Sequence, residues 1–61
     1  MLIYNNIKTI CDEKRLSIAE VEREAGLKNG TIGKWRTCSP RVENLKAVAD
    51  VLKVKVDKLL K

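Results

Sequence analysis

The sequence from Leu16 to Trp35 reads LSIAEVEREAGLKNGTIGKW and contains the clearest local signals in the chain. Within it, Ser17-Ile18-Ala19-Glu20 has the spacing of a capping box, in which each end residue's side chain accepts a hydrogen bond from the other's backbone N–H. This signal predicts a helix that begins after Ser17 and ends at about Ala25. Gly26 then stands where a left-handed backbone commonly terminates a helix.

The residues that follow predict a second, intrinsically weaker helix from about Lys28 to Arg36. Ile32 and Trp35 recur at helical spacing and supply its apolar side. Gly30 and Gly33 lie within it, and each costs about 0.5–1 kcal/mol relative to alanine. Such a helix must be held by tertiary packing. The two glycines otherwise indicate a loop, or a place where something approaches the backbone closely.

The rest of the chain also has the apolar spacing of helices. We expect helices from about Tyr4 to Lys14, from about Val42 to Leu52 and from about Val56 to Leu60. Ser39-Pro40 suits the N-cap and first position of the second of these, to within two residues. There is no alternation long enough for a sheet. The sequence therefore predicts an all-α fold, a compact bundle of five short helices in which residues 1–61 form a single domain.

Helices two and three of this bundle fit the helix-turn-helix geometry, in which two short helices meet through a glycine-containing turn. The geometry needs apolar side chains at fixed positions, so that both helices seat on the core. Counted from Ile18 as the first position, Gly26 falls on the turn. The apolar positions are filled by Val21, Ala25, Leu27, Ile32 and Trp35.

The composition excludes several classes of protein. The chain has 61 residues, a net charge of +5 and no histidine, which leaves no Ser-His-Asp triad and no zinc site of the two-cysteine, two-histidine type. Cys11 and Cys38 alone cannot supply the four ligands of a structural zinc site. We expect a cytoplasmic protein in which both thiols are reduced. The alternative is a disulfide between the two. No apolar run approaches the roughly 20 residues of a membrane span. We predict neither an enzyme nor a cofactor.

The positive charge is unevenly distributed along the chain. Segment 28–41 holds four basic residues and no acid, a net charge of +4. Segment 12–24 holds three bases and five acids, a net charge of −2. The excess therefore lies on the second helix of the helix-turn-helix and the loop after it. A solvated basic face is the ordinary explanation, and a surface that binds phosphates is the functional one.

Several groups of residues together carry a resemblance to a known family. They are Leu16-Ser17, Val21, Gly26, the run from Leu27 to Trp35, Pro40, Leu45, Val48-Ala49-Asp50, Leu52, Val54, Val56-Asp57 and Leu59-Leu60. On these residues the chain resembles the phage repressor and Cro-like (Xre-type) helix-turn-helix domains, of the lambda-repressor-like fold. The run from Leu27 to Trp35 is closer still to the N-terminal domains of prophage repressors of Gram-positive bacteria.

The resemblance implies that the third helix lies in the major groove of double-stranded operator DNA. Base contacts would then come from Asn29, Gly30, Thr31 and Lys34. Asn29 suits adenine, Lys34 suits guanine or a phosphate, and Gly30 would let the backbone approach the DNA. Phosphate contacts would come from Ser17, Ile18, Lys28, Arg36 and Arg41.

The function that we expect is sequence-specific transcriptional regulation by a phage or prophage repressor or a Cro-like protein. The resemblance implies a homodimer when bound to DNA, with no small-molecule substrate and no membrane. The alternatives are an antitoxin or chromosomal Xre-type regulator, or a helix-turn-helix fold used as a protein-interaction module. Val54, Val56, Leu59 and Leu60 are expected mostly in the core, or else in a dimer seam.

Glu22 departs from the family pattern, since the wider family usually has a small alanine where the two motif helices cross. A buried carboxylate there costs several kcal/mol unless it finds a partner. We expect Glu22 to accept hydrogen bonds from the first amides of helix three or from Asn29, or to pair with Arg36; otherwise it is exposed. The wider family also often pairs an arginine in helix one with a glutamate ending helix three. Those positions read Cys11 and Arg36, and Ile18 replaces a polar residue that touches DNA in many relatives.

Overall fold

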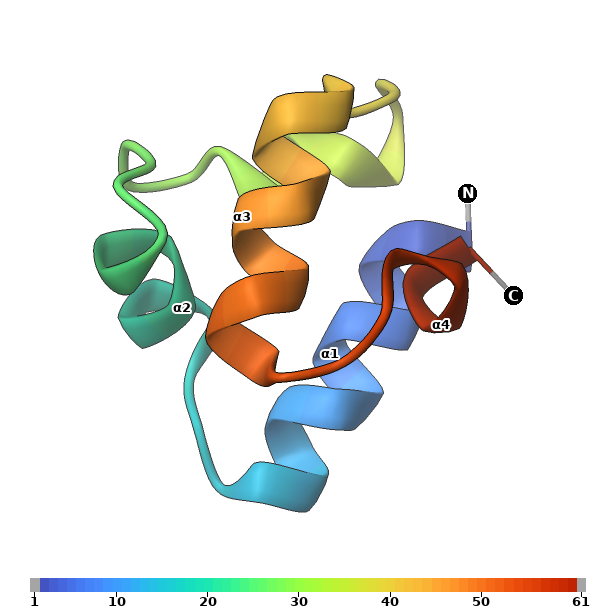
Figure 1. Cartoon of the computed structure of the whole chain (residues 1–61). Helices are drawn as coiled ribbons and strands as arrows, with labels where there is room; N and C mark the ends of the chain where they lie inside the picture. Colours follow the sequence, from blue (N-terminus) through green and yellow to red (C-terminus); the bar gives the residue numbers. More distant parts are fainter. Residues whose placement is uncertain (1, 61) are drawn as a thin grey trace.

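The computed structural model describes residues 2–60, which fold into four α-helices and one short 3-10 helix (Figure 1). The α-helices are α1 (Leu2–Lys14), α2 (Ile18–Glu24), α3 (Val42–Leu52) and α4 (Val56–Leu60), and the 3-10 helix is η1 (Ile32–Arg36). Helix α1 packs against η1 and α4, while α3 packs against α2 and α4. The all-α prediction is confirmed, and α3 and α4 have the predicted bounds.

The predicted count of five α-helices is wrong at the third helix. The segment expected to be helical from about Lys28 is a 3-10 helix over Ile32–Arg36 only, and a turn over 29–31 precedes it. The physical reason is Gly30, whose φ of +92° interrupts any right-handed helix. The helix-turn-helix therefore consists of α2, a turn and η1.

The core is formed by the apolar faces of all five helical segments. The residues with no exposed surface are Ile7, Cys11, Val21, Ile32, Val48, Leu52 and Leu59. Trp35 is 4% exposed, which confirms its predicted place in the core. Cys11 and Cys38 are both free thiols, the first buried and the second exposed. Burial raises the pKa of the Cys11 thiol, which therefore stays protonated and packs as a small apolar side chain.

The apolar residues at the end of the chain are only partly in the core. Leu59 is buried, and Val54 and Val56 are half-buried against the core. Leu60 is 51% exposed, so the expectation that it lies in the core is wrong. In the short α4 only Leu59 is fully buried, because Leu60 lies about 100° further around the helix.

The capping box at the start of α2 forms as predicted. The Ser17 Oγ atom accepts a hydrogen bond from the N–H of Glu20, and the Glu20 Oε1 atom accepts one from the N–H of Ser17, both at 3.0 Å. These bonds lower the pKa of Glu20 and keep its carboxylate charged. The predicted N-cap of α3 is displaced from Ser39 to Arg41, within the expected two residues.

The helices α1, α2 and α3 all end in the same way. A residue with a left-handed backbone follows each helix: Arg15 (φ +58°) directly after α1, Lys53 (φ +58°) directly after α3, and Gly26 (φ +77°) after the right-handed Ala25 at the end of α2. The next N–H group then bonds back to the last turn of the helix: Leu16 to the carbonyl of Cys11, Leu27 to that of Glu22 and Val54 to that of Ala49. This is the Schellman pattern, and glycine adopts it without strain. The β-carbons of Arg15 and Lys53 make the same conformation costly.

Replacing Lys53 by glycine should stabilise the fold. We expect Lys53→Gly to raise the free energy of unfolding by up to about 1 kcal/mol, because the left-handed strain is removed. Gly26→Ala, at the matching position of α2, should lower it by about 1 kcal/mol. A β-carbon at Gly26 meets nothing within 4 Å, so that loss comes from the backbone alone. Urea unfolding followed by circular dichroism measures both, and equal stabilities of all three proteins would contradict the prediction.

Candidate nucleic-acid interface

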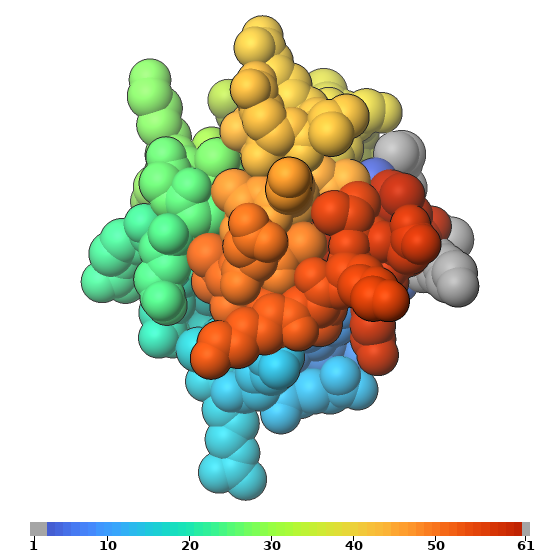
Figure 2. All heavy atoms as spheres, viewed as in Figure 1, coloured from blue at the N-terminus to red at the C-terminus, as the bar shows by residue number. Residues whose placement is uncertain are grey.

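The residues expected to contact DNA lie on one continuous segment and on the start of α2. In Figure 1 this segment runs from α2, over the turn beside it, to η1 and the loop that leads into α3. The exposed members are Ser17, Lys28, Asn29, Gly30, Lys34, Arg36 and Arg41. Ile18 and Thr31 are half-buried. In the space-filling view the green part of the chain, around residue 30, stands out from the body of the protein (Figure 2).

The turn before η1 is held by a buried carboxylate from α2. Glu22 is 3% exposed. Its Oε1 atom accepts a hydrogen bond from the N–H of Gly30 at 3.1 Å, and its Oε2 atom accepts one from the N–H of Ile32 at 2.8 Å. Of the predicted partners for Glu22, the amides at the start of the third helix are therefore the correct ones.

Gly30 uses both of its backbone groups inside the protein. Its N–H donates to Glu22, and its carbonyl accepts a hydrogen bond from the N–H of Lys34 at 3.3 Å. A β-carbon at Gly30 would meet nothing within 4 Å, so glycine is needed there for its positive φ and not for lack of space. The N–H and the carbonyl of Gly30 are thus both occupied in the free protein.

A small hollow lies between α2 and this turn. Its volume is about 370 Å³, and it is lined by Ala19, Glu22, Arg23, Leu27 and Asn29. It places Asn29 beside the exposed side of α2. Arg23 is a basic residue at this surface that the sequence analysis did not select, because it lies in the acidic segment 12–24.

The expected phosphate contacts Ser17, Ile18 and Arg41 lie at the starts of α2 and α3, which are capped differently. At α2 the N–H of Ser17 is already bonded to Glu20, so Ser17 offers its hydroxyl hydrogen. At α3 the N-cap residue is Arg41, whose side chain makes no capping hydrogen bond. The Nη1 atom of Arg41 lies 3.9 Å from Oε1 of Glu43, an exposed ion pair that contributes little.

Arg36 lies against α1. Its guanidinium carbon is 5.3 Å from the centre of the Tyr4 ring, a cation–π distance. Its Nε–H donates to the carbonyl of Gly33 at 3.2 Å. This contact joins α1 to the end of η1, where the wider family often has an arginine–glutamate pair. Sequence reasoning missed Tyr4, since nothing local links it to Arg36.

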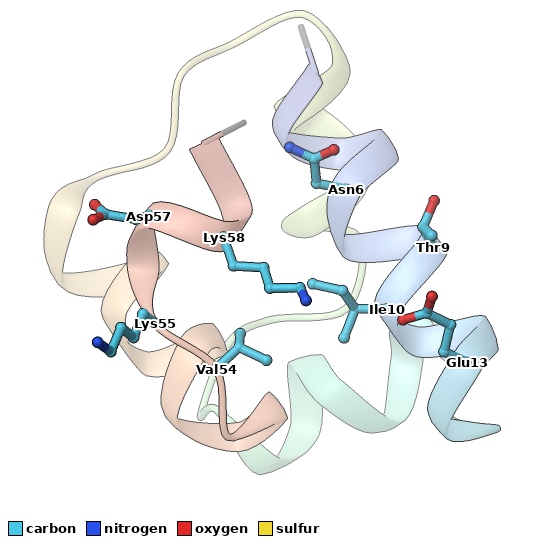
Figure 3. Close-up of a pocket in the computed structure, with 8 residues that line it drawn as sticks. All are labelled: Asn6, Thr9, Ile10, Glu13, Val54, Lys55, Asp57 and Lys58. Carbon is cyan, nitrogen blue, oxygen red and sulfur yellow. The ribbon is translucent and has the colours of Figure 1, made fainter.

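A larger groove lies between α1 and the joint from α3 to α4 (Figure 3). Its volume is about 760 Å³, and it is lined by Asn6, Thr9, Ile10, Glu13, Val54, Lys55, Asp57 and Lys58. The Lys58 side chain extends from α4 toward Ile10 on α1 (Figure 3). The lining carries two acids and two bases and none of the residues expected to contact DNA. This groove is therefore separate from the candidate interface.

Removing the Glu22 carboxylate should loosen the turn and destabilise the protein. Glu22→Ala leaves two inward-facing N–H groups without their acceptor, and we expect a loss of about 2–4 kcal/mol in the free energy of unfolding. Glu22→Gln keeps one acceptor oxygen and should lose less. Glu24→Ala, at an exposed site on the same helix, is the control and should change stability by less than about 0.5 kcal/mol. Urea unfolding and hydrogen exchange of the Gly30 and Ile32 amides measure this, and wild-type stability of Glu22→Ala would refute the role of Glu22.

The comparison with known proteins identifies the family. Among residues 2–60 no helix is both long and apolar enough to cross a membrane. No curated protein and no solved structure matches the chain significantly. The family model of the Cro/C1-type HTH DNA-binding domain matches residues 6–61, which include α2, the turn, η1 and both later helices. The chain therefore belongs to the Cro/C1-type helix-turn-helix DNA-binding domains.

Proposed function

We propose that residues 1–61 form one DNA-binding domain of a sequence-specific transcriptional regulator, which acts by binding double-stranded DNA and not by catalysis. Family membership carries the proposal, and the charge distribution supports it. The four basic residues of segment 28–41 are all exposed, and that segment has no acid to neutralise them. A basic surface of this kind supplies the phosphate contacts that dominate affinity for DNA.

Base recognition would fall to Asn29, Thr31 and Lys34, with Gly30 allowing close approach. Glu22 fixes the turn that carries the first two of these side chains, so they meet the major groove in a set geometry. An asparagine amide matches the N6 and N7 edge of adenine, and a lysine donates to guanine O6 or N7. The methyl group of Thr31 can meet the methyl group of thymine.

Phosphate contacts would come from the residues on either side of the turn. Lys28, Arg36 and Arg41 are exposed cations, which position a protein on the duplex without reading sequence. The start of α2 adds the hydroxyl group of Ser17 and the backbone N–H of Ile18, since the N–H of Ser17 is already bonded to Glu20.

The biological setting that we propose is a phage or prophage repressor or a Cro-like protein in the cytoplasm. The similarity of the run from Leu27 to Trp35 to prophage repressors supports this choice over an antitoxin or a chromosomal regulator. We also propose that two copies bind one operator, because one small helix-turn-helix contacts only a half-site. Leu60, 51% exposed, offers apolar surface to a second copy.

The proposal predicts different effects for base-reading and phosphate-binding residues. Selection of binding sites from random DNA should yield a defined sequence, and Asn29→Ala should relax the preference at one position and weaken binding by about 1–3 kcal/mol. Lys28→Ala should weaken binding to all sequences and lower the slope of log Kd against log salt concentration by about 1.

The matched control is Lys55→Ala, which removes one exposed lysine at the groove of Figure 3 and should leave sequence preference and salt slope nearly unchanged. If Asn29→Ala lost affinity but kept the same base preference at every position, the base-reading role of Asn29 would be refuted. If the wild-type chain bound no DNA specifically even at low salt, the interaction module would become the better hypothesis.

A further inference from the structure

The contact between Tyr4 and Arg36 joins residues 32 positions apart, one in the first turn of α1 and the other at the end of η1. We infer that Tyr4 is a positioning residue that holds the guanidinium of Arg36 ready for a phosphate of the bound DNA. This inference rests on the proposed function. It gives α1, which carries none of the expected DNA contacts, a part in binding.

The guanidinium of Arg36 makes two contacts within the protein. The Tyr4 ring lies 5.3 Å from its central carbon, and the Nε–H is tied to the carbonyl of Gly33 at 3.2 Å. Tyr4 is itself half-buried against the core, so the ring that Arg36 contacts does not move freely. The N–H donors of a guanidinium lie in its plane. A ring contact combined with a bond at Nε therefore leaves the N–H groups of both Nη atoms for an acceptor.

The charge of Arg36 is not neutralised within the described part of the chain. The ion pairs there are Lys8–Asp12 and Arg41–Glu43. Arg36 is exposed, and it follows the expected base-reading residue Lys34 by two positions. A bidentate fork with no carboxylate partner, beside a DNA-reading segment, is suited to a phosphate.

Tyr4 raises the affinity for DNA because it restricts the side chain of Arg36 before DNA binds. A free arginine side chain loses much of its rotamer freedom when it binds a phosphate. The contacts with the Tyr4 ring and the Gly33 carbonyl already reduce the rotamer freedom of Arg36 in the free protein. The side chain therefore loses less conformational entropy when DNA binds. Arg41 differs, since its side chain is held only by an exposed ion pair with Glu43 at 3.9 Å, which contributes little.

A double-mutant cycle with the full chain and the selected DNA site tests the inference. Fluorescence anisotropy over a range of salt concentrations gives the affinity and the salt slope. Arg36→Ala should weaken binding and lower the salt slope by about 1. Tyr4→Leu should weaken binding about two- to fivefold, while Tyr4→Phe, which keeps the ring, should bind as wild type. In the Arg36→Ala background, Tyr4→Leu should cause no further loss.

Controls separate positioning from folding. Asn5→Ala changes an exposed neighbour on the same helix and should leave binding unchanged. Circular dichroism at the assay temperature measures the folded fraction of each variant, and affinities are compared per folded molecule. In addition, the Nε–H signal of Arg36 in nuclear magnetic resonance spectra of the free protein should be protected in wild type and Tyr4→Phe and broadened in Tyr4→Leu.

The results distinguish a failure of the inference about Tyr4 from a failure of the proposed function. An equal loss from Tyr4→Leu with and without Arg36 would make Tyr4 a merely structural residue and overturn the inference. An unchanged salt slope in Arg36→Ala would also overturn the inference about Tyr4. In that case, an altered base preference in Asn29→Ala would still support the proposed function. A wild-type chain that binds no DNA would overturn both.

Discussion

The pair of hydrogen bonds from Gly30 and Ile32 to the Glu22 carboxylate is the interaction on which the helix-turn-helix depends. Helices are usually capped by a residue just before their first turn, but Thr31, at the N-cap of η1, makes no side-chain capping bond. Glu22 supplies the cap from the neighbouring helix instead. Its backbone carbonyl also accepts the N–H of Leu27, which ends α2. One residue thus holds the turn at both of its ends and fixes η1 relative to α2.

This arrangement explains why the second helix of the motif is so short. A carboxylate that reaches the amides of Gly30 and Ile32 together draws the chain into a turn, and the positive φ of Gly30 is part of that turn. An α-helix through the same residues would need a right-handed backbone at Gly30. The turn excludes the longer helix and places Asn29 and Thr31 on a loop of defined geometry before η1. The buried Glu22 carboxylate and the short η1 are therefore parts of one arrangement.

Sequence reasoning succeeded where the signal was local or periodic. The capping box, the left-handed Gly26 and the bounds of α3 follow from spacing and residue type alone. The requirement that a buried carboxylate find partners was enough to name the amides of the third helix among the candidates for Glu22. The two glycines indicated a loop as the alternative to a longer third helix, but the point where η1 begins also depends on the contact of Glu22 with the amides of Gly30 and Ile32. The contact of Tyr4 with Arg36 was missed because it joins separate segments of the chain.

The segment proposed to read DNA is stable only because its neighbours hold it. Five residues of 3-10 helix with a glycine among them would not persist alone in water. Glu22 holds its start, the contact between Tyr4 and Arg36 holds its end, and Ile32 and Trp35 anchor its buried side. These contacts exist in the free protein, so binding needs to order only side-chain tips and not a helix. Sequence preference would then depend on how rigidly Glu22 holds the turn that carries Asn29 and Thr31, and affinity on how Tyr4 holds Arg36.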